Sequence, residues 1–193
     1  MRLITLAVVM MAGAALFAPE TASARAPFFG NFSGTCTVNV PIAKKKKKRI
    51  RSQARAQQNG PSNYDMRAVV NAAANGEKFE IVLDLNADNT GTVTINGQVV
   101  AGPTPKSLRP LAAKKAKPKK LKFKLKATGT ATFVGPLRQD LSFAGKYKGS
   151  PFNVKGVLDL DPAGGLILDT KVTFKKKSPL GKKMSFSFQG DRT

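Results

Sequence analysis

The sequence contains no histidine, no tryptophan and only one cysteine among its 193 residues. Without histidine, neither a Ser-His-Asp nor a Cys-His catalytic arrangement can form, and a histidine-bound metal is excluded. A single cysteine cannot form a disulfide within the chain, so packing must stabilise the fold. Cys36 shares the apolar side of an alternating segment, which favours a buried, unpaired thiol over a reactive nucleophile.

Acidic residues are scarce: 11 Asp and Glu stand against 33 Lys and Arg, for a formal net charge of +22. Asp84, Asn86 and Asp88 have the spacing of calcium-loop ligands. The glycine and the glutamate that such a loop needs are replaced by Asn89 and Ile95, so a hairpin turn is the better interpretation. No phosphate-binding glycine loop is present. We therefore expect a non-catalytic protein with no metal and no cofactor.

The one long apolar run lies at the N-terminus. Met1 and Arg2 precede LITLAVVMMAGAALFA, and the small residues Ala22, Ser23 and Ala24 follow it. This apolar core is too short to cross a bilayer, and the small residues are typical of a cleavage site. Residues 1–24 are predicted to be a secretory signal peptide cut after Ala24, with an uncleaved anchor as the alternative. The chain from 25 to 193 would then be exported to the periplasm or the extracellular space.

Alternation of apolar and polar residues dominates the rest of the chain, which indicates β-strands with one buried face. Eight segments show it: 32–40, 78–86, 91–100, 120–134, 141–147, 152–160, 166–174 and 184–188. Most of the connections between them are short and rich in turn residues. The pattern predicts one all-β domain, an antiparallel up-and-down sheet of about eight strands that is barrel-like, with a sandwich as the alternative.

One segment follows a different period. Met66, Val69, Val70 and Ala73 recur at i, i+3, i+4 and i+7, with capping residues on either side. This spacing predicts a short helix over residues 64–75.

Three predicted loops, at 41–63, 101–119 and 175–183, are rich in basic residues and contain no acid. In an up-and-down sheet with a helix at 64–75, these loops fall at one end of the domain. The aspartates at 84, 88, 140, 159 and 161 fall at the other. Lys120, Lys122, Lys124 and Lys126 also line the outer face of one strand. The candidate polyanion-binding residues are Lys44, Lys45, Lys46, Lys47, Lys48, Arg49, Arg51, Arg55, Lys114, Lys115, Lys117, Lys119, Lys120, Lys175, Lys176, Lys177, Lys182 and Lys183.

A basic end of this kind concentrates polyanions around the protein. The sequence therefore predicts an exported binding domain whose partner is nucleic acid, acidic polysaccharide or an anionic membrane surface. Charge that only keeps the protein soluble is the simpler interpretation of the same residues. Two further alternatives remain open: a barrel that carries a small apolar ligand among its phenylalanines, and a small outer-membrane barrel with its apolar face outward.

Overall fold

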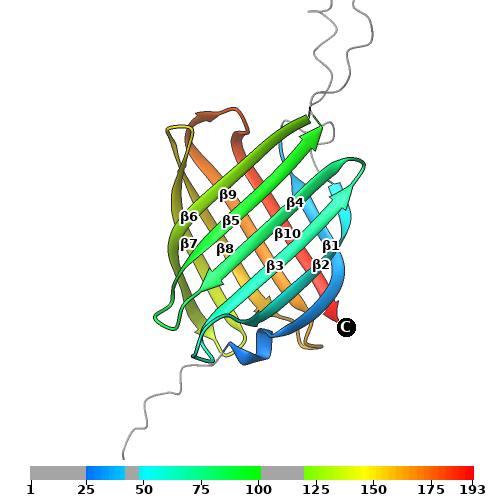
Figure 1. Ribbon diagram of the computed structural model, residues 1–193, viewed down its shortest axis with the longest axis vertical. Helices are drawn as coiled ribbons and strands as arrows, with labels where there is room; N and C mark the ends of the chain where they lie inside the picture. The colour runs from blue at the N-terminus through cyan, green and yellow to red at the C-terminus, as the bar shows by residue number, and fades with distance from the viewer. Residues whose placement is uncertain (1–24, 42–47, 101–119) are drawn as a thin grey trace, which may run out of the picture.

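A computed structural model describes residues 25–41, 48–100 and 120–193. The chain forms a closed barrel of antiparallel strands in which each strand pairs with its neighbours in sequence and the last pairs with the first (Figure 1). A short 3₁₀ helix, η1 (Ala26–Phe28), precedes the barrel. The strands are β1 (Gly30–Asn39), β2 (Lys48–Gln58), β3 (Met66–Ala74), β4 (Glu77–Leu85), β5 (Thr90–Val100), β6 (Lys120–Gly135), β7 (Arg138–Tyr147), β8 (Ser150–Leu160), β9 (Leu166–Ser178) and β10 (Gly181–Arg192).

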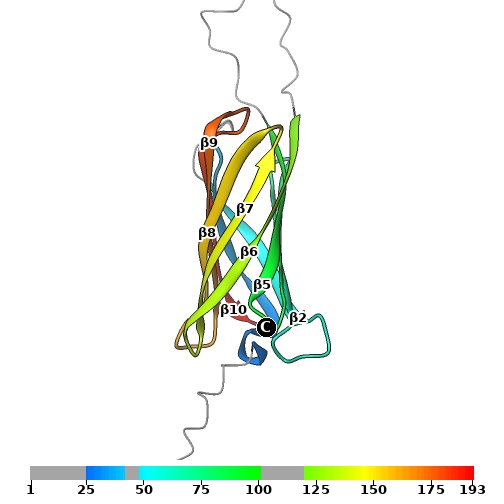
Figure 2. The same cartoon turned by 90° about the vertical axis from the view of Figure 1, so that its left-hand side faces the viewer.

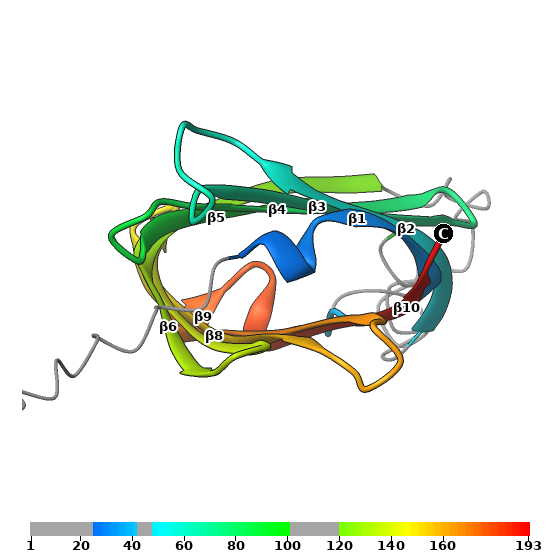
Figure 3. The same ribbon diagram turned by 90° about the horizontal axis from the view of Figure 1, so that it is seen from below.

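The predicted all-β, up-and-down barrel is confirmed, and each of the eight alternating segments forms a strand. β10 closes the ring by pairing with β1 from Phe32 opposite Arg192 to Asn39 opposite Ser185. The barrel is flattened, so two broad sides face each other (Figures 2 and 3). Closure leaves no unpaired edge strand among the described residues, which removes the usual route to edge-to-edge aggregation.

The helix predicted for residues 64–75 is wrong, because β3 occupies that segment. Met66, Ala68 and Val70 point into the barrel as alternate residues, and β3 pairs on both sides, with β2 and β4. An alanine-rich segment fits both the helical and the alternating period. Hydrogen bonding to two neighbouring strands decides between them, because tertiary pairing overrides local propensity.

The basic loop predicted at 41–63 is also wrong over residues 48–58, which form β2. Its inward residues are Ile50, Ser52, Ala54 and Ala56, and its arginines point outward. Small inward residues give a weaker alternation than the leucines and phenylalanines of the other strands. These two additional strands raise the count from the predicted eight to ten.

The basic loop predicted at 175–183 is largely strand as well. β9 continues to Ser178 and β10 begins at Gly181, so only Pro179 and Leu180 connect them. The Ser178 hydroxyl donates to the carbonyl of Gly181 at 2.7 Å and accepts from the amide of Leu180 at 3.2 Å, which holds this tight turn. Consecutive lysines do not prevent strand pairing when their side chains can reach solvent.

Phenylalanine rings pair inside the barrel. Phe79 on β4 lies 5.8 Å from Phe186 on β10, across the interior, and Phe152 on β8 lies 5.5 Å from its register partner Phe174 on β9, measured between ring centroids. Such tilted ring pairs stabilise a core beyond the area they bury. The interior between these strands is therefore occupied by side chains.

The prediction that Cys36 is buried and unpaired is confirmed: its exposed fraction is 1%, and it is a free thiol. Burial raises the pKa of the Cys36 thiol to about 11, because the thiolate would lose its hydration. The unfolded chain ionises this thiol at a lower pH than the folded chain does. The stability that the neutral thiol contributes is therefore present below the unfolded pKa and is lost as the pH rises through the folded one.

Replacing Cys36 with alanine should remove this pH dependence. The free energy of unfolding of the parent should fall relative to that of Cys36→Ala by about 2–3 kcal/mol between about pH 8 and 11. Urea unfolding at several pH values measures both proteins under the same conditions, so the titration of the lysines cancels in the difference. Parallel pH profiles for the two proteins would contradict the assignment.

Arg25 and η1 close the barrel end that is lowest in Figure 1 and faces the viewer in Figure 3. The Arg25 side chain is fully buried, and its Nε donates to Gln139 Oε1 at 3.0 Å. Its Nη1 donates to the carbonyls of Tyr64 and Asn86, and its Nη2 donates to Asn89 Oδ1 at 2.9 Å. Burial lowers the pKa of this guanidinium, and the charges of nearby aspartates partly offset that effect. One buried cation thus ties together two connections and β7.

We expect Arg25→Ala to lower the free energy of unfolding by about 3 kcal/mol, because buried carbonyls and the Gln139 amide would lose their donor. Arg55→Ala is the matched control: Arg55 is exposed on the outer face of β2, and its loss should change stability by less than about 0.5 kcal/mol. Guanidinium unfolding monitored by circular dichroism measures both. Equal stability of the two variants would show that Arg25 does not anchor this end.

Candidate functional site: the basic end and the outer groove

The two ends of the barrel differ in charge. The upper end in Figure 1 is where odd-numbered strands finish and even-numbered strands begin, and the lower end carries η1 and the C-terminus. β2 and β3 stand where a loop and a helix were predicted. Because two successive strands return the chain to the end from which they start, the C-terminal ends of β1, β5 and β9 still lie at the same end of the barrel. The upper end therefore gathers the residues that flank all three lysine-rich connections.

Most of the predicted binding residues that the structure describes lie at the upper end. Arg49 and Arg51 point outward near the start of β2, and Lys120 is the first residue of β6. Lys175 and Lys176 lie near the end of β9, and Lys182 and Lys183 at the start of β10; their side chains are exposed. Lys48 and Lys177 belong to β2 and β9. Lys44, Lys45, Lys46, Lys47, Lys114, Lys115, Lys117 and Lys119 fall outside the described residues.

Arg55 does not join this group. It lies far along β2, opposite Asn31 at the start of β1, and therefore toward the lower end. The prediction placed it in a loop, but the strand carries it away from the other arginines. The upper end also has exposed lysines that the predicted set lacks: Lys78, Lys122, Lys124, Lys146 and Lys148. Lys122 and Lys124 were predicted on the outer face of a strand, as the structure has them. Lys78, Lys146 and Lys148 are placed at the upper end only by the strand register.

The aspartates at 84, 88, 140, 159 and 161 lie at the lower end, as predicted. The ion pairs among the described residues are found there too. Arg67 pairs with Asp84 at 2.9 Å, and Arg138 lies 3.9 Å from Asp140 and 3.6 Å from Asp159. None of these three ion pairs involves a lysine. The exposed lysine side chains of the upper end are accessible to a ligand.

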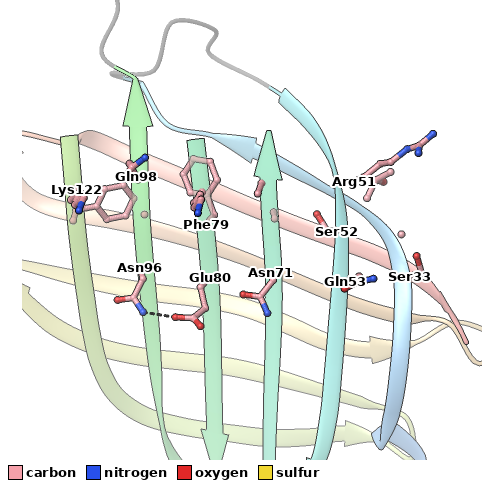
Figure 4. Close-up of a pocket in the computed structure, with 17 residues that line it drawn as sticks. Ser33, Arg51, Ser52, Gln53, Asn71, Phe79, Glu80, Asn96, Gln98 and Lys122 are labelled. Carbon is pink, nitrogen blue, oxygen red and sulfur yellow. Dashed lines mark hydrogen bonds between the residues drawn. The ribbon is translucent and has the colours of Figure 1, made fainter. Parts of the chain in front are cut away.

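A groove of about 1000 Å³ runs across the outer face of β1 to β6, toward the upper end (Figure 4). Its floor is one cross-strand row of register partners whose side chains point inward. That row consists of Gly34, Ser52, Ala72, Phe79, Gly97 and Phe123. A Cβ at Gly97 would lie 2.1 Å from the Phe123 ring, so the ring packs directly on the backbone of β5. Four residues of this row are small, so the floor of the groove lies below the outward side chains of the two adjacent rows.

Two rows of outward side chains border the floor. The lower row is Ser33, Gln53, Asn71, Glu80 and Asn96, each directly opposite the next. The upper row is Thr35, Arg51, Ala73, Lys78, Gln98 and Lys122. One border is thus mostly uncharged amides and the other carries three cations. The uncharged border could not be predicted from the sequence, because single Asn and Gln residues on separate strands carry no signal until the register places them side by side.

Within the lower row, the side chains of Glu80 and Asn96 are hydrogen-bonded: Asn96 Nδ2 donates to Glu80 Oε2 at 2.6 Å. In the upper row, Gln98 Nε2 donates to the carbonyl of Gly76 at 2.9 Å. Cross-strand pairs of this kind fix side-chain orientation on an exposed sheet face. The side chains of Gln53 and Asn71 hydrogen-bond to no other residue that the structure describes, and both are exposed.

In the described part of the chain, no three Cys, Asp or Glu side chains are grouped so as to hold a metal ion. The same residues include no helix with the length and hydropathy of a membrane span. No protein family, curated protein or solved structure matches this chain. The geometry of the site therefore carries the functional argument.

Proposed function

We propose that this protein is an exported binding module that holds polyanions at the basic upper end of its barrel. The supporting observation is the separation of charge: exposed lysines and arginines gather at one end, and the aspartates lie at the other. Charge that serves solubility alone has no need to be segregated. A one-sided positive field concentrates a polyanion and orients it toward the upper end.

The binding free energy would come mainly from release of the counter-ions that a polyanion condenses. Lysines supply most of the positive charge, and a lysine ammonium acts as a mobile point charge rather than a fixed fork. Affinity at the upper end should therefore depend strongly on salt and weakly on ligand sequence. Export by the signal peptide expected at 1–24 would bring this surface to anionic polymers outside the cytoplasm.

The two other candidates have less support. A carrier of an apolar molecule needs interior space, and rings from opposite walls meet between β4 and β10. An outer-membrane barrel needs an apolar outer face. On β6 the outward residues from Lys120 to Thr132 are lysines and threonines, the leucines and Phe123 point inward, and Val134 near its end is an exposed apolar residue. We therefore do not propose either of them.

Replacing Lys182 and Lys183 with glutamine should weaken binding of duplex DNA and of heparin and should make the salt dependence shallower. For DNA, the log–log slope against salt should fall by about 0.9 for each phosphate that the variant no longer neutralises. The matched control is Lys155→Gln with Lys171→Gln, which removes the same charge from a mid-barrel position where the two lysines face each other. Fluorescence anisotropy at several salt concentrations measures both variants.

The parent should bind both polymers at physiological salt, and the upper-end variant should lose more affinity than the control. If the parent binds neither polymer, or if both variants lose the same affinity, the upper end serves solubility and the proposal is wrong.

A further inference from the structure

We propose that the outer groove binds a linear acidic polysaccharide in which carboxylate-bearing sugar units alternate with uncharged ones. This inference rests on the proposed polyanion binding and assigns it a specific site. The groove is bordered by cations on one side and by amides on the other, so it matches a polymer with anionic groups along one edge and hydroxyls along the other.

The spacing of the three cations sets the spacing of the anionic groups. Arg51, Lys78 and Lys122 lie on β2, β4 and β6, which are alternate strands of the same sheet. Adjacent strands are about 4.8 Å apart, so the backbone positions that carry these cations recur roughly every 10 Å across the groove. Each strand of duplex DNA carries a phosphate about every 3.4 Å along the helix axis, three times as densely. The groove therefore suits a polymer whose charges are sparse.

The aromatic residues of the groove also argue against single-stranded nucleic acid. Proteins that bind it without sequence preference stack bases on exposed aromatic rings. Phe79 and Phe123 contribute to the floor, but their rings point into the barrel and are only 3% and 6% exposed. The polar groups that the groove offers to a ligand are therefore amides, hydroxyls and the charged side chains of its borders.

The lower row supplies hydrogen bonds of both kinds. Gln53 and Asn71 lie directly opposite each other, and each side-chain amide offers both donors and an acceptor. Sugar hydroxyls donate and accept in the same way, so such amides can bind uncharged units. Glu80, in the same row, repels carboxylates and directs them toward the cationic row. Figure 4 shows Asn96, Glu80, Asn71 and Gln53 side by side on four strands.

The groove crosses six strands, which span about 24 Å at the usual strand separation. That length accommodates several sugar units, so an oligosaccharide is the appropriate probe. A hyaluronan octasaccharide carries a carboxylate on every second sugar and matches the proposed pattern. An oligogalacturonate of equal length, with a carboxylate on every sugar, tests the spacing. Oligo-dT and duplex DNA report polyanion binding in general.

The test variant is Gln53→Thr with Asn71→Thr, which removes two groove amides without changing the net charge. Threonine suits an exposed strand position, so the barrel should remain folded. The matched control is Gln57→Thr with Asn153→Thr, because these exposed residues lie outside the groove. Isothermal titration calorimetry with each probe at physiological salt measures the affinities.

The expected result is that the parent and the control bind the hyaluronan octasaccharide, and more tightly than they bind oligogalacturonate. The test variant should bind it about tenfold more weakly, since two hydrogen bonds are removed, and its DNA binding should be unchanged. Equal hyaluronan binding by the test and control variants would overturn the groove assignment while leaving polyanion binding intact. Loss of oligo-dT binding in the test variant would reassign the groove to nucleic acid. Binding of no probe by the parent would overturn both proposals.

Discussion

The pairing of β10 with β1 is the constraint on which the rest of the structure depends. Once the ring is closed, every strand residue points either into the barrel or away from it, because successive side chains alternate. The phenylalanines and leucines fill the interior, and the lysines on the same strands are held outside. Closure thus converts an alternating sequence into an apolar core surrounded by a basic surface.

The alternating direction of successive strands determines where that charge collects. In an up-and-down barrel, connections alternate between the two ends, so the ends of β1, β5 and β9 lie together and the aspartate-rich turns lie opposite. Arg25 closes the lower end from within, where carbonyls and amides from two connections and β7 surround its guanidinium. The exposed lysines lie at the upper end. A buried, hydrogen-bonded arginine thus closes one end of the barrel, and exposed positive charge gathers at the other.

Large apolar residues made most of the fold predictable. Leu121, Phe123 and Leu125 alternate so clearly that β6 could be assigned without a structure. β2 and β3 were missed because their inward residues are mainly alanine and serine, whose small side chains fit a loop or a helix equally well. The groove could not be predicted at all. Its borders combine residues from six strands, and only the register places Gln53 opposite Asn71.

The central claim is that the upper half of the outer face, across β1 to β6, contacts an acidic polymer. The most direct measurement is a map of backbone amide chemical-shift changes in the labelled protein as hyaluronan octasaccharide is added at physiological salt. The account predicts changes concentrated at Arg51, Asn71, Lys78, Asn96 and Lys122 and near-zero changes around Arg25 and the aspartate-rich turns. Changes spread evenly over the barrel, or concentrated at its lower end, would contradict it.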